Sequence, residues 1–151
     1  MNATNTDRIE KKALLRAPRA KVWQALADAP TFGRWFGVDL AGPFVVGTLV
    51  RGTFTHEAYQ HVPFEVMVER TEPERLISWR RSHPAEPGAD SEPTTVVVFE
   101  LDEVQDGTLL TVVESGFDGI PLSRRAEMCR AHEDGWTHQL EAIRRFVEGA
   151  A

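Results

Sequence analysis

A long amphipathic stretch near the C-terminus, residues 123–148, constrains the fold of this chain more than any other part of the sequence. Pro121 precedes the stretch, Ser123 is placed to cap a first helical turn, and Gly149 to end the last one. A helix of about 26 residues is close to 39 Å long, so its apolar side needs a large partner surface. The apolar residues that form one stripe at about 100° per residue are Cys129, Trp136, Leu140, Ile143 and Val147.

The partner surface is predicted to be a sheet, because the preceding sequence is rich in strand patterns. A strand over residues 8–16 is followed by a helix that begins at Pro18 and is broken by Ala29-Pro30. A second short helix or turn then carries Phe32, Trp35 and Phe36. Short links between successive strands imply antiparallel pairing, and the long helix covers one face. The further strand candidates are residues 45–46, 48–55, 64–69, 76–81, 94–102 and 108–114.

The strongest hairpin signal is Asp106-Gly107, between the last two strand candidates. A two-residue turn would place Glu114 on the face of Phe99 and Leu101, whereas a three-residue turn with a bulge would place Thr111 and Val113 there. Both registers remain open at this point. In either case Gly107 is expected to need a positive φ.

Composition and charge exclude several classes of protein. The 151 residues are 42% hydrophobic and 26% charged, which suits one domain spanning residues 1–151. The net charge of −6 argues against nucleic-acid binding. With Cys129 as the one cysteine, we expect no intrachain disulfide, no metal site and no cofactor. No signal peptide or membrane-length apolar run is visible, so a cytoplasmic protein is expected.

Five short motifs, in order along the chain, resemble the START-like helix-grip (SRPBCC) superfamily. They are Ala17-Pro18-x-x-x-Val22-Trp23-x-Ala25-Leu26, Arg34-Trp35-Phe36, Pro73-Glu74-Arg75-Leu76 closing in Trp79, Asp106-Gly107-Thr108-x-Leu110, and His132-x-x-Gly135-Trp136. The third motif is similar to the subgroup named after the C-terminal domain of the Hsp90 ATPase activator.

This resemblance implies an α+β helix-grip fold: a curved antiparallel sheet of about six to seven strands wrapped around the long C-terminal helix, with two short helices after the first strand. It also implies an apolar cavity between helix and sheet, in which members of the superfamily bind lipids, sterols, hormones or polyketides. A minority of members catalyse cyclisation or dehydration.

The residues expected to line this cavity come from the helix, the sheet and the second short helix. His132 lies one turn before Trp136, where it either hydrogen-bonds a strand or orients a ligand. Glu133, at the edge of the stripe, is solvated or else paired with Arg51, Arg80 or Arg81. The predicted ligand-binding residues are Trp35, Phe54, Val66, Trp79, Phe99, His132, Trp136 and Leu140.

Three functions follow from these residues and the resemblance, and no catalytic residue is assigned. The first is a binding protein for a hydrophobic small molecule, lipid-like or aromatic polyketide-like. The second is a partner of an Hsp90-type chaperone that acts through its surface. An enzyme resembling a polyketide cyclase, with His132 and an acid in the pocket, ranks last. The sequence is compatible with a monomer or a homodimer.

Overall fold

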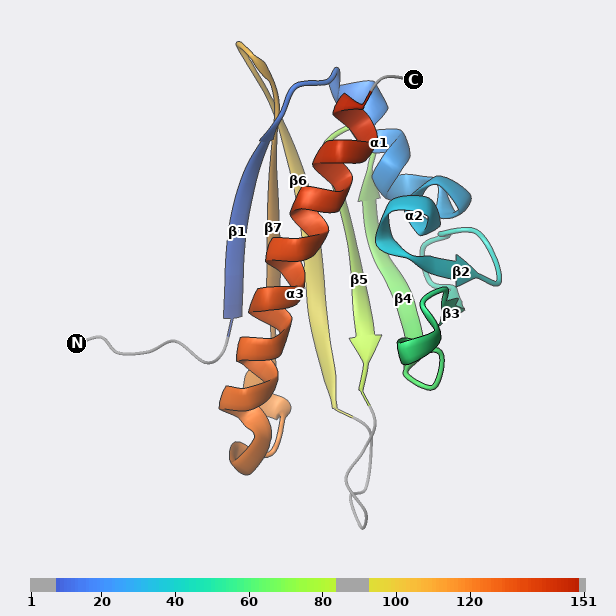
Figure 1. The fold of residues 1–151 in the computed structure, drawn as a ribbon, viewed down its shortest axis with the longest axis vertical. Coiled ribbons are helices and arrows are strands. Elements are labelled where there is room, and N and C mark those ends of the chain that lie inside the picture. The colour runs from blue at the N-terminus through green and yellow to red at the C-terminus, as the bar shows by residue number, and fades with distance from the viewer. Residues whose placement is uncertain (1–7, 84–92, 150–151) are drawn as a thin grey trace, which may run out of the picture.

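The computed structural model describes residues 8–83 and 93–149, which form a seven-stranded sheet with a long helix across one face (Figure 1). The strand order is β1-β7-β6-β5-β4-β3-β2, and every neighbouring pair is antiparallel. This confirms the predicted helix-grip fold. The strands are β1 (Arg8–Leu15), β2 (Val38–Leu40), β3 (Leu49–Phe54), β4 (Pro63–Glu72), β5 (Leu76–Ser82), β6 (Thr94–Val104) and β7 (Gly107–Ser115). The helices are α1 (Arg19–Ala27), α2 (Ala29–Phe36) and α3 (Leu122–Glu148), with single 3-10 turns η1 (Glu57–Tyr59) and η2 (Phe117–Gly119).

Helix α3 buries the predicted apolar stripe against the sheet, with all five of its residues at most 8% exposed. The prediction that Ser123 caps the helix is wrong. The helix starts one residue earlier, after Pro121, and no side chain caps it. At the other end Gly149 donates its N–H to the carbonyl of Arg145, as expected for a terminating residue. None of the described helices is both long and apolar enough to cross a membrane.

The β6–β7 hairpin resolves the register that the sequence leaves open. Val104 pairs with Gly107, so the two turn residues are Gln105 and Asp106, not Asp106 and Gly107. Glu114 pairs with Val97 and lies on the face of Phe99, as the two-residue alternative predicts. Gly107 has φ 148°, and a Cβ there would lie 2.2 Å from the Leu15 carbonyl oxygen. The glycine is therefore required by the close approach of the chain after β1.

Helix α2 fills the part of the sheet that α3 leaves uncovered. Asp28 caps it by accepting a hydrogen bond from the Thr31 N–H at 3.2 Å. Phe32 packs edge-on against Trp79 with ring centroids 6.3 Å apart, and Phe36 lies 5.6 Å from Phe64. The aromatic side chains of α2 thus complete the core over β4 and β5.

The chain between β2 and β3 differs from expectation. Val45 and Val46 lie outside the sheet, and their side chains are 51% and 52% exposed. The strand candidate at 45–46 is therefore wrong. The backbone there forms a turn, because the Thr48 N–H donates to the Val45 carbonyl.

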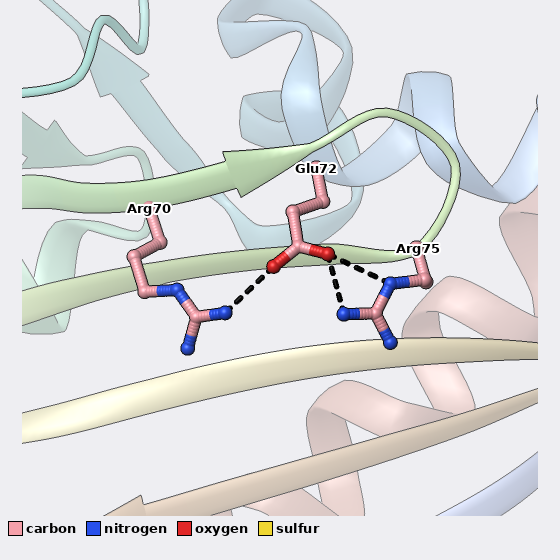
Figure 2. A network of polar contacts seen from close by, with 3 residues as sticks. All are labelled: Arg70, Glu72 and Arg75. Carbon is pink, nitrogen blue, oxygen red and sulfur yellow. Dashed lines mark hydrogen bonds and ion pairs between the residues drawn. The ribbon is translucent and has the colours of Figure 1, made fainter.

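The tight β4–β5 turn carries an exposed charge network, shown in Figure 2. Glu72 accepts a hydrogen bond from Arg70 at 2.6 Å and two from Arg75. These hydrogen bonds lower the pKa of Glu72, but such solvent-exposed pairs add little to stability. The network lies at the start of β5, at the opposite end of that strand from Arg81.

Candidate functional site

Polar side chains gather at one end of the sheet face that α3 covers. Along β5 the inward positions are Ile77, Trp79 and then Arg81, because alternate residues share a face. Arg81 pairs with Thr95 on β6, and the Thr95 hydroxyl donates to Glu114 on β7, which pairs with Val97 two residues further along β6. The otherwise apolar face therefore ends in a guanidinium, a hydroxyl and a carboxylate on three adjacent strands.

Glu114 is the centre of this polar end, and its side chain is 1% exposed. Oε1 accepts hydrogen bonds from two residues of α3, His132 Nδ1 at 2.9 Å and Trp136 Nε1 at 2.8 Å. Oε2 accepts from Thr95 Oγ1 at 2.7 Å, and His83 Nε2 lies 2.8 Å from the same hydroxyl. Glu114 therefore has three donors, and two of them, His132 and Trp136, join α3 to the sheet.

The geometry fixes where the protons are. Burial alone would raise the pKa of Glu114, but the hydrogen bond and positive charge of His132, with the bonds from Thr95 and Trp136, lower it to about 2. Since Thr95 donates its hydroxyl proton to Glu114, it accepts from His83, so His83 carries its proton on Nε2. Burial, followed by the charges of Arg81 and His132, lowers the pKa of His83 to about 4. At neutral pH the site thus holds an ionised Glu114 and a neutral His83.

A pocket of about 670 Å³ opens beside this network, between α3, the C-terminal end of α2, β3, η1 and the end of β5. His132 and Arg81 lie on its polar side, with Gln139 and His138 further along α3. Its apolar wall is formed by Trp35, Phe36, Phe54, Val62 and Trp136, with the ring of Tyr59 at η1. The pocket therefore combines aromatic walls with a small number of polar groups, as small-molecule sites do.

No side chain of the described residues forms a hydrogen bond or an ion pair with the Arg81 guanidinium. Its Nε is buried without a hydrogen-bond partner. The guanidinium carbon lies 5.0 Å from the centroid of the Phe64 ring. Burial lowers the pKa of Arg81, and the negative charge of Glu114 partly offsets this effect.

The structure brings together four of the eight residues predicted to bind a ligand. Trp35, Phe54, His132 and Trp136 line the pocket. Leu140 lies on the other side of α3, beside β1. The remaining three, Val66, Trp79 and Phe99, are at most 1% exposed and lie in the packed core. Ligand binding by any of the eight stays a prediction.

The core position of these three residues has a clear cause. Phe32 of α2 covers Trp79, and Trp136 of α3 packs against Phe99 with ring centroids 5.6 Å apart. The aromatic side chains of α2 and α3 fill the space over the centre of the sheet. The pocket therefore lies to one side of it, next to β3 and η1.

The sequence did not predict that Arg81 lines the pocket, since it was considered only as a partner for Glu133. Glu133 instead lies near Lys11, with Oε2 3.6 Å from Nζ, and its side chain is 57% exposed. The available signal was the period of two, which places Arg81 on the face of Trp79. That signal does not show that Arg81 stays unpaired, because the cross-strand neighbours depend on register.

The fold and the site define a helix-grip domain with a pocket beside its long terminal helix. The model of the family described as "Activator of Hsp90 ATPase homolog 1-like protein" matches residues 16–148. The chain belongs to this family.

Solved structures share the fold over nearly the whole chain. DynU16, described as a putative protein in the dynemicin biosynthetic locus, is 26% identical with a TM-score of 0.76, over 95% of this chain and 48% of its own. A protein from Arthrobacter aurescens is 18% identical with a TM-score of 0.80, over 99% of this chain and 91% of its own. The Aha1 dimer from Colwellia psychrerythraea is 17% identical with a TM-score of 0.74, over 94% and 96%. No curated protein matches the sequence.

Proposed function

We propose that this protein binds a hydrophobic small molecule, lipid-like or aromatic polyketide-like, in the pocket beside α3. The observation that carries the proposal is the pocket of about 670 Å³, with Trp35, Phe36, Phe54 and Trp136 on its wall. This volume lies within the range of about 300–1,000 Å³ typical of small-molecule sites. The superfamily resemblance supports the same class of function.

Affinity in such a site comes mainly from buried apolar area, at about 25 cal/mol per Å² before the costs of association. His132 and Arg81 contribute orientation instead, because they are polar groups in a lining that is otherwise mostly aromatic and apolar. The Glu114 network holds His132 in one place, so this part of the pocket is preformed.

A titration with the neutral fluorophore N-phenylnaphthylamine tests the proposal. Wild type is expected to bind it saturably. Phe54→Ala removes one wall residue and should weaken binding by about tenfold, as expected for losing an aromatic contact. The matched control is Phe146→Ala, a change at a 36% exposed position of α3 that does not line the pocket. If neither this probe nor a panel of lipids and aromatic polyketides binds saturably, the proposal is rejected.

A second candidate, a partner of an Hsp90-type chaperone, is favoured by a strip of exposed apolar residues on β3, β4 and the preceding loop. Leu49 and Met67 pair across the two strands and are 41% and 40% exposed, next to the loop that carries Val45 and Val46. The family description and the Aha1 neighbour support this candidate.

The test measures the ATPase rate of a purified Hsp90 with wild type and with Met67→Glu. Stimulation by wild type that is lost in Met67→Glu would favour the partner function.

Sedimentation of the free protein decides between monomer and homodimer.

A further inference from the structure

We propose that the pocket selects apolar molecules that carry one carboxylate, and that Arg81 binds this group. The inference rests on the proposed small-molecule function and names the chemical class of the ligand. It starts from an imbalance in the site: among the described residues Arg81 has no hydrogen bond and no ion pair, although it lines the pocket.

The buried carboxylate that attracts Arg81, Glu114, is hydrogen-bonded to other residues. Glu114 accepts from His132 and Trp136 on one oxygen and from Thr95 on the other. The Arg81 guanidinium is attracted by this carboxylate but makes no hydrogen bond to it. Its buried Nε is a hydrogen-bond donor without an acceptor. Such a buried donor costs free energy unless another group accepts its hydrogen bond.

The outward-facing arginines of the same sheet show the contrast. Arg80 donates to Glu69 at 3.0 Å, Arg51 to Glu65 at 2.7 Å. Each has a carboxylate partner on a neighbouring strand. Arg81, on the opposite face, lies against the aromatic ring of Phe64 and lines the pocket. The position thus places a planar cation with free donors at an apolar cavity.

The chemistry of the missing partner follows from these features. A carboxylate accepts two parallel N–H bonds from a guanidinium, which gives both affinity and a fixed orientation. One unpaired cation calls for one negative charge, so a monoanion fits better than a phosphate monoester. The rest of the ligand faces Trp35, Phe54 and Trp136 and is therefore apolar.

Decanoate and decanol share an apolar chain and differ at the polar end, so they isolate the role of the charge. Each is used to displace N-phenylnaphthylamine from wild type, Arg81→Met and Arg80→Met. Wild type should prefer decanoate over decanol by about tenfold or more, as for other charge-assisted hydrogen bonds. Arg81→Met should remove this preference, because it weakens decanoate binding more than decanol binding. Arg80→Met, which removes a neighbouring charge from the outer face, should keep it.

The outcomes separate this inference from the function on which it rests. If neither compound displaces the probe and no probe binds, the binding function itself fails. Equal affinity for decanoate and decanol in wild type overturns the carboxylate proposal while binding stands, and tighter binding of decyl phosphate than of decanoate does the same. Should Arg81→Met not fold, the comparison of ligands on wild type still decides.

Discussion

His132 on α3 is hydrogen-bonded to Glu114 on β7, with 2.9 Å between Nδ1 and Oε1, so a polar contact joins the long helix to the sheet inside the core. Replacing the carboxylate should therefore cost more than a surface change. Glu114→Ala leaves His132, Trp136 and Thr95 without their acceptor and should lower the free energy of unfolding by about 3–5 kcal/mol. Urea denaturation at neutral pH measures this loss.

The control for this change is Glu133→Ala, next to His132 on α3 but 57% exposed. It should alter the free energy of unfolding by less than about 0.5 kcal/mol. A loss below about 1 kcal/mol in Glu114→Ala would mean that water or rearranged side chains replace the carboxylate.

Stability should fall in two steps as the pH is lowered. The pKa of His83 is about 4 in the folded protein against an ordinary 6.5, so between these values the unfolded chain binds more protons and stability is lost. The size of this step is on the order of 3 kcal/mol. The pKa of Glu114 is about 2 in the folded protein against an ordinary 4.5. Between these values the unfolded chain again binds more protons, so stability falls a second time as the pH is lowered. Unfolding midpoints from pH 7 to pH 3 test both steps.

His83→Gln isolates the first step, because the glutamine amide can still donate to Thr95 but does not titrate. In this variant the free energy of unfolding should depend less steeply on pH between 6.5 and 4. His61→Gln, at an exposed position, should leave this dependence unchanged. An equal slope in wild type and His83→Gln would show that other groups carry the acid sensitivity.

Gly107→Ala should destabilise the protein by roughly 2–4 kcal/mol. The added Cβ would lie 2.2 Å from the Leu15 carbonyl oxygen at a φ of 148°, so backbone must move. Gly135→Ala is the matched control, since nothing lies within 4 Å of a Cβ at that helical position. It should stabilise by about 0.5–1 kcal/mol through helix propensity. Thermal unfolding of both variants should show shifts of opposite sign.

Leu140→Ala should lower the free energy of unfolding by about 2–5 kcal/mol, because Leu140 is 8% exposed in the stripe that faces the sheet. Leu122→Ala makes the same change on the same helix at a side chain that is 77% exposed. Its effect should stay within about 0.5 kcal/mol. Similar losses in the two variants would contradict the assigned face of α3.

The periodic parts of the fold were predictable because local patterns determine them. The buried stripe of α3 shows a period of 3.6, and Val97, Phe99 and Leu101 show a period of two. The position of the hairpin turn was not predictable in this way. Gly107 is needed where the chain after Leu15 approaches it, and that contact joins segments far apart in sequence.

The candidate site was predictable only in part for the same reason. His132 and Trp136 follow from the helix pattern, Trp35 from a motif of the resemblance, and Phe54 from the strand pattern of residues 48–55. Whether Trp79 contacts a ligand or a neighbouring side chain depends on how deeply Phe32 of α2 is inserted between the helices and the sheet. Sequence spacing contains no information about that depth.

The sheet order also has a consequence for how the chain is made. Strand β1 lies at an edge and pairs with β7, with Leu15 opposite Thr108, so all the other described strands are synthesised between the two partners. On the ribosome the apolar residues Ile9 and Leu15 of β1 emerge long before β7, the strand with which β1 pairs. The first of the described strands to be translated is therefore among the last to be paired, and a chain truncated before Gly107 lacks the strand that pairs with it.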